Sequence, residues 1–446
     1  MKKFRPIINL IIVALSLLFM QCTSEVVPVQ GIDGIDGIDG IDGIDGLDGL
    51  EGLDGDDIAV CIDCHSDEHR APIEDAYAIS AHNMGLQRPD GSYRKHVYGS
   101  NEGRVKDDGS IQYSRGFCAQ CHNNEGYQDR INYGTFNPQG YFSNISITCT
   151  GCHGNSIHRS LDFVNDGNDY TLRQIDEVKE LMNPTNYISV ANEGETWSTS
   201  NTCIMCHQIR PDRYGIWEAP LLDSAEKDWD GNFVVDPAAT VDGIPGGSIT
   251  YWRSKQYLRE WYPYPASTTY TNNYNNLPSL HVNAQANVFI GMTGIAIEGS
   301  VTQLPAEKSS AHFGVKCAGC HMDTPSNDAN EGSHTFRPSL NLCVNCHQAG
   351  GPENVTGFET AFEELTAALS SKTAYFNTSA SSGNVSLKVS NPASGDTIGT
   401  TNTIVVPLKY AQAFWNYLLI RADRNEGLHN PPYTMALIAN SIEALQ

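Results

Sequence analysis

Six copies of the pattern Cys-x-x-Cys-His are the residues of this sequence best suited to chemistry. Two thiols at this spacing can form thioether bonds to the two vinyl groups of a haem, and the imidazole that follows can bind the iron as proximal ligand. The thiols are Cys61, Cys64, Cys118, Cys121, Cys149, Cys152, Cys203, Cys206, Cys317, Cys320, Cys343 and Cys346, and the imidazoles are His65, His122, His153, His207, His321 and His347. The repetition predicts six covalently bound haem c groups.

Zinc binding and disulfide formation are the alternative uses of such cysteine pairs. Structural zinc closes one CxxC pair with a second pair or with histidines, and it requires no histidine directly after the second cysteine. Disulfide bonds have no such requirement either. The motifs use twelve of the thirteen cysteines, each pair followed by histidine, which favours haem attachment over both alternatives.

The N-terminus predicts export, which haem attachment requires in bacteria. Lys2, Lys3 and Arg5 precede an apolar run over residues 7–20, which is short for a membrane span. We interpret residues 1–21 as a signal peptide. The stretch LLFMQC resembles a lipoprotein cleavage site, although a glutamine stands where a small residue is usual, so we expect lipidation of Cys22. An ordinary signal peptide with one unused cysteine is the alternative.

Residues 22–57 are predicted to form the lipid anchor and an acidic tether. Glycine occupies every third position from Gly31 to Gly55, the spacing that a collagen triple helix requires. The repeat contains no proline, and its regularly spaced aspartates would repel one another in a trimer. We therefore favour an extended tether. A trimerising collagen-like stalk, as the working part of a surface-interaction protein, is the alternative.

The formal net charge of −24 restricts the partners of the chain. Such an acidic protein is a poor match for nucleic acid, whereas a basic redox protein, another cytochrome or an extracellular electron acceptor is compatible with it. Acylation of Cys22 would add the lipid membrane as a partner. We expect an exported outer membrane or cell-surface lipoprotein, with a periplasm-facing orientation as a second option.

The spacing of the motifs predicts one hexahaem domain over residues 58–350, in which haems form much of the core. We expect a mainly α fold with extensive ordered loops. Residues 211–280 are an aromatic-rich insertion without a motif, which either packs internally or contacts a partner. Motifs close in sequence, such as those at Cys118 and Cys149 or at Cys317 and Cys343, are expected to hold neighbouring haems.

The C-terminal region, residues 351–446, is predicted to be mainly helical. The apolar residues that follow a helical period are Phe358, Phe362, Leu365 and Leu369. Residues 410–421 and 433–445 predict two further helices, the second begun by two prolines. Alternating apolar residues from Val385 predict a short strand in a small β-hairpin that ends near Val406.

Eight histidines lie outside the motifs, and six of them occur in contexts similar to distal haem-ligand motifs. These six are His82, His158, His281, His312, His334 and His429. His312 precedes a motif that already has His321 as proximal ligand, so we expect it to bind the iron of a neighbouring haem. His69 and His96 are interpreted as surface histidines or, alternatively, as pocket groups of a catalytic site.

Four stretches resemble the large multihaem cytochrome c superfamily: SLHVNAQANVFIGMTGIAIEG, SSAHFGVKCAGCHM, GSHTFRPSLNLCVNCH and the terminal GLHNPPY with its following helix. The resemblance covers residues 61–347 and 410–446. That superfamily includes pentahaem nitrite reductases, octahaem hydroxylamine oxidoreductases and tetrathionate reductases, and relatives that only transfer electrons. It implies a multihaem cytochrome c fold in which the C-terminal helical region supplies a distal ligand.

The sequence departs from the enzymes of that superfamily. It has no CxxCK motif, which carries the lysine-ligated catalytic haem typical of the nitrite reductases, and its six motifs match neither five nor eight. Six distal histidines would saturate every iron, which suits electron transfer without substrate binding. We therefore predict an electron carrier with no catalytic residues. It could self-associate, since hexahaem extracellular nanowire cytochromes share this haem number. A terminal reductase of a small nitrogen or sulfur oxyanion, with one open haem, is the alternative.

Overall fold

The computed structural model describes much of the chain from residue 66 onward. The described residues are 66–84, 86–87, 93–94, 104–105, 111–112, 116–137, 141, 146–154, 172–181, 185–209, 240–241, 244–245, 251–253, 283–323, 328–347, 355–387 and 405–446. The predictions for the signal peptide, Cys22, the tether, the first motif, His96, His158 and His281 lie outside these residues, as does most of the insertion over residues 211–280.

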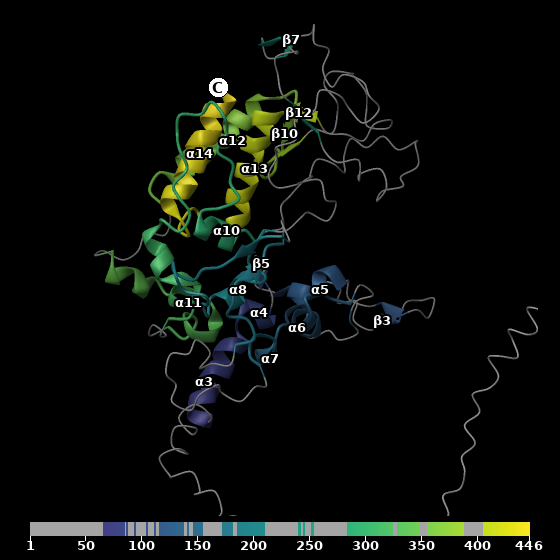
Figure 1. The fold of residues 1–446 in the computed structure, drawn as a ribbon, viewed down its shortest axis with the longest axis vertical. Helices are drawn as coiled ribbons and strands as arrows, with labels where there is room; N and C mark the ends of the chain where they lie inside the picture. The colour runs from purple at the N-terminus through teal and green to yellow at the C-terminus, as the bar shows by residue number, and fades with distance from the viewer. Residues whose placement is uncertain are drawn as a thin grey trace, which may run out of the picture. The chain divides into compact units, whose positions relative to one another are not determined.

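Three C-terminal helices pack against one another around one apolar core (Figure 1). They are α12 (Phe358–Ser371), α13 (Leu408–Asp423) and α14 (Pro431–Leu445). The ring of Phe362 in α12 stacks on Tyr417 in α13, with 5.2 Å between the ring centroids. α14 begins with two prolines, whose missing N–H groups need no helical partner, and Asn430 caps it by accepting from the Tyr433 N–H. The three predicted helices are confirmed.

The strands of the described residues form two-stranded antiparallel sheets. Their pairs are β1 (Leu86–Gln87) with β2 (Tyr93–Arg94), β3 (Arg104–Val105) with β4 (Ile111–Gln112), β5 (Val178–Lys179) with β6 (Tyr187–Ile188), β7 (Thr240–Val241) with β8 (Ile244–Pro245), β9 (Tyr251–Arg253) with β12 (Val405–Pro407), and β10 (Phe376–Thr378) with β11 (Val385–Leu387). The expected mainly α character with small strands is therefore present.

The predicted hairpin ending near Val406 is wrong in its pairing. The strand at Val385, β11, exists, but it pairs with β10, which precedes it in the chain across a short turn. β12, which contains Val406, pairs with β9 from the aromatic-rich insertion. A short loop closes at lower entropic cost than a long one, which favours β10 as the partner of β11. Val385, Ser386 and Leu387 are all buried, so β11 packs on both faces and its apolar alternation did not reveal its partner.

Polar side chains of α13 and α14 hold the extended segment over residues 292–302. The Ile295 N–H donates to Asn416 Oδ1 at 2.8 Å, and Asn416 Nδ2 returns a bond to the Ile295 carbonyl at 2.9 Å. The Ile297 N–H donates to Asn440 Oδ1 at 2.9 Å. Because Asn416 and Asn440 are buried, these bonds replace the water that the segment would otherwise need. They fix the chain that leads from α10 (Gln285–Ile290) towards the fifth motif.

The described motifs lie on short helices rather than on the long C-terminal ones. The motif cysteines lie in or next to α5 (Gly116–His122), α7 (Cys149–Cys152), α8 (Asn201–Ile204), α11 (Lys316–His321) and the 3-10 turn η4 (Leu340–Asn345). The other short elements of this region are α3 (Asp67–Ala78), α4 (Ala81–Met84), α6 (Asn124–Tyr133) and the 3-10 turns η2 (Ala311–Gly314) and η3 (Ser333–Thr335). A second apolar cluster, which includes Tyr127, Ile204, Phe289 and Phe313, packs between several of them. Within the described residues, no helix has the length and apolarity needed to span a membrane.

Substitution of Asn416 by alanine should destabilise the C-terminal core. It removes three hydrogen bonds, two with the backbone of Ile295 and one to Ser441 Oγ, and leaves the partly buried backbone groups of Ile295 without this partner. We expect a cost of about 2–4 kcal/mol of unfolding free energy. Denaturant unfolding measures this loss. Gln303→Ala, which removes an exposed amide, is the matched control and should change stability by about 0.5 kcal/mol or less. Equal stability of the two variants would contradict the role of Asn416.

Candidate haem-ligand sites

In three of the described motifs, a backbone hydrogen bond links the histidine to the first cysteine of the same motif. The backbone N–H of the histidine donates to the carbonyl of that cysteine in the third, fourth and sixth motifs, at 2.8 Å for His153, 3.0 Å for His207 and 2.7 Å for His347. One turn of chain therefore places two thiols and an imidazole together. No disulfide joins the cysteines whose side chains are described, which are Cys121, Cys149, Cys152, Cys203, Cys206, Cys317, Cys320, Cys343 and Cys346. Cys118 lies in α5, and its side chain is not among those described.

The structure brings four motif histidines opposite four of the predicted distal histidines. The ring centroids are separated by 6.1 Å for His82 and His207, 6.3 Å for His153 and His334, 6.3 Å for His312 and His347, and 6.4 Å for His321 and His429. Every pair combines one motif histidine with one predicted distal histidine. The fourth, third, sixth and fifth motifs are involved, in that order. We call these the four histidine pairs.

The separation within the pairs fits two imidazoles on opposite sides of one haem iron. With iron–nitrogen bonds of about 2.0 Å and about 1.1 Å from each nitrogen to its ring centroid, the two centroids should lie about 6.2 Å apart. Rings in direct edge-to-face contact can also lie at this distance, so the recurring combination of a motif histidine with a predicted distal histidine carries the assignment. In addition, Nδ1 of His334 is buried without a hydrogen-bond partner in the described part of the chain. Such an orphaned nitrogen is costly unless a bound group relieves it.

Hydrogen bonds to Nδ1 orient four of these imidazoles and leave Nε2 for a metal. His312 Nδ1 bonds the Leu428 carbonyl at 2.8 Å, and His321 Nδ1 bonds the Phe336 carbonyl at 2.9 Å. His429 Nδ1 lies 2.6 Å from Asp423 Oδ1, and that carboxylate is only 2% exposed. His207 Nδ1 makes a longer contact, 3.4 Å, with Gln285 Oε1. A carbonyl or carboxylate at the second ring nitrogen is the usual support of a metal-binding histidine.

Burial favours the neutral imidazole, which is the form that binds metal. Desolvation lowers the pKa of His82 to about 4, with a further contribution from the neighbouring His207. His82 is nevertheless an exposed residue by surface area, so the lowered pKa reflects the density of protein around the site and not a closed packing of this side chain. Desolvation is also the main cause that lowers the pKa of His207, His321 and His334. A neutral imidazole needs no proton release before it binds iron.

Thiols from different motifs lie side by side. Cys203 is hydrogen-bonded to Cys317, and Cys206 to Cys121, which joins the fourth motif to the fifth and to the second. The partner thiol and burial together raise the pKa of Cys203 and Cys206 well above the usual thiol value. Cys320 of the fifth motif also interacts electrostatically with Cys343 of the sixth. Thiols of successive motifs are therefore neighbours, and the fourth motif adjoins two others.

Polar residues at the start of α10 and just before it hold the fourth motif by hydrogen bonds. Asn283 Nδ2 donates to the Cys206 carbonyl at 3.1 Å, and Asn287 Oδ1 accepts from the Ile209 N–H at 2.7 Å. Gln285 Nε2 donates to the Asp423 carbonyl at 3.2 Å while its oxygen contacts His207. These side chains alternate along NAQAN, a regularity that could have marked them as functional in the sequence.

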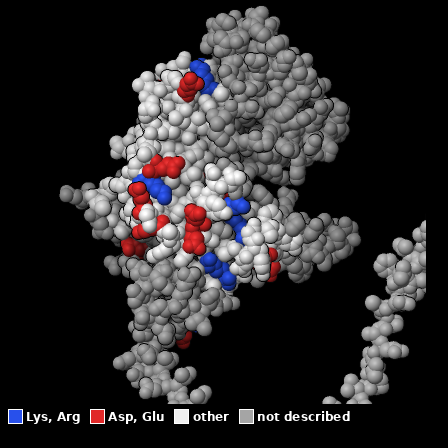
Figure 2. Space-filling model, viewed as in Figure 1, with Lys and Arg blue, Asp and Glu red and all other residues white. Residues whose placement is uncertain are grey.

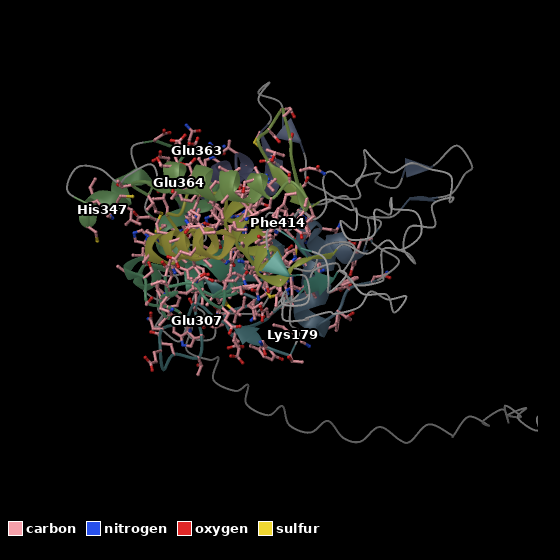
Figure 3. The ribbon with its side chains drawn as sticks, turned by 90° about the horizontal axis from the view of Figure 1, so that it is seen from above. Lys179, Glu307, His347, Glu363, Glu364 and Phe414 are labelled. Carbon is pink, nitrogen blue, oxygen red and sulfur yellow. The ribbon has the colours of Figure 1, made fainter. Side chains whose placement is uncertain are left out.

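The histidines of the first two motifs and the other candidate histidines belong to none of the four histidine pairs. His122 ends α5, and the two other candidate distal histidines, His158 and His281, lie outside the described residues, as does His65. His69 lies on α3, is exposed and belongs to none of the four histidine pairs. Sequence reasoning missed Asp423, Gln285 and Phe336 as supports of the imidazoles. His347 is exposed and lies apart from the C-terminal helix that carries Phe414 (Figure 3).

Comparison with known proteins gives one distant likeness. No protein-family model matches the chain, and no curated protein matches it. The crystal structure of the outer cell wall cytochrome OcwA is similar, with a TM-score of 0.40 and 14% sequence identity. The match covers 84% of this chain and 50% of that one, so this chain spans half the length of OcwA. That protein is a cytochrome, the class that the motifs predict here, but a likeness this distant assigns no function.

Arg130 should stabilise the junction between α6 and the fourth motif. Its guanidinium is buried and donates to the Met205 carbonyl at 2.6 Å and to Cys121 Sγ at 3.6 Å. Hydrogen bonds from a charged donor contribute about 1.5–3 kcal/mol, so Arg130→Ala should lower the unfolding free energy by that amount. Arg70→Ala is the control, because Arg70 forms an exposed ion pair with Glu74, which solvent screens, so its loss should leave the unfolding free energy nearly unchanged. Equal losses in denaturant unfolding would argue against the junction.

Proposed function

We propose that this chain is a hexahaem c-type cytochrome that transfers electrons along mostly bis-histidine haems outside the cytoplasm. The observation that carries the proposal is the set of four histidine pairs, each separated by the distance that an iron between two imidazoles requires. Each pair joins a motif histidine, which chemistry already links to haem, with a histidine from a remote segment. Chance packing gives no reason for that combination to recur.

The residues of the chain would hold haem in two ways. The cysteine pairs of the motifs would form the thioether bonds, and the four histidine pairs would supply both axial ligands of the third to sixth haems. For the first two haems we propose His65 and His122 as proximal ligands, with His158 and His281 as distal ligands in either order. Bound haem supplies a one-electron redox centre, while the protein positions it and tunes its potential.

Axial saturation favours electron transfer over reduction of a bound substrate. An iron held by two imidazoles has no position for an oxyanion, and under this proposal the four histidine pairs would saturate four irons in this way. The alternative, a reductase with one open haem, requires that one of the first two haems lack its distal histidine. His69 would then be a pocket group, yet it is exposed and belongs to none of the four pairs.

The sequence supports the rest of the proposal. The acidic charge suits a basic redox partner or another cytochrome, and an acylated Cys22 with the acidic tether would hold the haem domain at a membrane surface. On the face shown in Figure 2, acidic and basic side chains lie beside each other among the described residues. We therefore base the choice of partner on net charge rather than on a local patch. Self-association into a longer conduit remains part of this proposal.

Replacing His312 or His429 by alanine should open one iron. Each variant is expected to keep six covalently bound haems by mass spectrometry, since the cysteines are intact. About one haem in six should change from low-spin to high-spin in the electron paramagnetic resonance spectrum of the oxidised protein. His69→Ala is the control and should leave every haem low-spin. If both ligand variants stay fully low-spin, the pairing is incorrect; a high-spin haem in the unmodified protein would favour the reductase.

Asp423 should lower the reduction potential of the haem held by His321 and His429. A carboxylate that accepts the Nδ1–H of His429 makes the imidazole a stronger electron donor, which stabilises oxidised iron. Asp423→Asn weakens this bond by about 1 kcal/mol, so one potential should rise by on the order of 40 mV. A spectroelectrochemical titration measures the shift. Asp328→Asn, at an exposed site, is the control, and identical titrations of both variants would refute the tuning role.

A further inference from the structure

The turn after η3 contains a strained aromatic residue. Phe336 adopts the left-handed conformation, with φ 56° and ψ 18°, which is rare for a bulky side chain and costs about 1–3 kcal/mol. The surrounding backbone holds it there. The Gly332 N–H donates to the Arg337 carbonyl at 2.8 Å, and the Ser333 N–H donates to the Asp323 carbonyl at 3.1 Å. Strain that is maintained in this way calls for a local function.

Phe336 contacts one member of each of three histidine pairs. Its carbonyl accepts the bond from His321 Nδ1 at 2.9 Å. Its ring packs edge-to-face on His82, with centroids 4.6 Å apart and planes at 85°. The same ring lies 5.7 Å from the ring of His334, at 68°. The three histidines belong to the pairs of the fifth, fourth and third motifs respectively.

We propose that Phe336 is a positioning residue that sets the orientation of axial imidazoles at three haem sites at once. This inference rests on the proposed haem ligation. The carbonyl fixes which nitrogen of His321 faces the iron, and the ring restricts rotation of His82 and His334 about their bonds to iron. A right-handed or extended backbone at Phe336 would aim the carbonyl elsewhere relative to the ring. One residue could then no longer serve all three sites, which accounts for the strain.

The angle between the two imidazole planes on an iron provides a direct readout. Nearly perpendicular planes give a low-spin haem a highly anisotropic electron paramagnetic resonance signal, and planes closer to parallel give a rhombic one. The angles are 84° at His82 and 72° at His312, but 32° at His334 and 34° at His321. The oxidised holoprotein should therefore contain both kinds of signal.

The test is Phe336→Ala in the oxidised holoprotein, with haem content measured in parallel. Loss of the ring should shift or broaden two signals. One is the highly anisotropic signal of the His82 site, and the other is the rhombic signal of the His334 site. The second highly anisotropic signal should stay, because neither imidazole of the His312 site touches Phe336. His312→Ala identifies that signal by abolishing it. All six haems should remain attached and low-spin.

Phe336→Gly and Phe376→Ala make the test decisive. Glycine adopts φ near 56° without strain, so Phe336→Gly removes the ring, preserves the turn and should reproduce the spectral change. If Phe336→Ala fails to retain six haems, Phe336→Gly tests the positioning role of the ring in its place. Phe376 lies in the apolar core of the C-terminal helices, and Phe376→Ala should lower stability while leaving every signal in place.

The outcomes separate the two proposals. Six low-spin haems with unchanged signals in Phe336→Gly would overturn the positioning role and leave the electron-transfer function intact. A shift of the same signals in Phe376→Ala would also overturn it, because general destabilisation would then explain the spectra. Fewer than six low-spin haems in the unmodified protein would overturn the proposed function itself.

Discussion

The separation of 6.1–6.4 Å between the ring centroids of the four histidine pairs is the constraint that the packing of remote segments meets. No pair is formed within one helix or one turn. His82 meets His207, His153 meets His334, and His321 meets His429, each across more than a hundred residues of chain. The connecting segments must therefore be held by contacts of their own, because neither imidazole can position the other across the gap.

Hydrogen bonds between the imidazole Nδ1 atoms and side-chain or backbone oxygens supply much of that control. The C-terminal helices serve two pairs at once, since Asp423 orients His429 and the adjacent Leu428 carbonyl orients His312. The short connection between α13 and α14 thus links the C-terminal core to two histidine pairs. α10 orients His207 in the same way, because Gln285 Oε1 contacts His207 Nδ1. The apolar pattern of the C-terminal helices indicates only packing. Under the proposed ligation, α10 and these helices also support the histidines that bind iron.

The elements that could be predicted are those governed by local pattern. The helices α12, α13 and α14 follow from apolar periodicity and from the prolines before Tyr433, because a helix needs only contacts within a few residues. The pairing of β11 and β12 could not be predicted. Strand partners depend on loop closure and on burial of both faces, and β12 finds its partner in an insertion some 150 residues earlier, at β9.

The sequence by itself determined which cofactor class is predicted and which residues are its candidate ligands, because Cys-x-x-Cys-His is complete within one turn of chain. His312 and His429 could also be named from their contexts. Which imidazole faces which was decided by tertiary structure alone, since the partners come from segments that only the packed core brings together. The same holds for Asp423 and Phe336. A buried carboxylate and a left-handed phenylalanine leave no mark in sequence, because their roles arise from where neighbouring segments place a ring nitrogen.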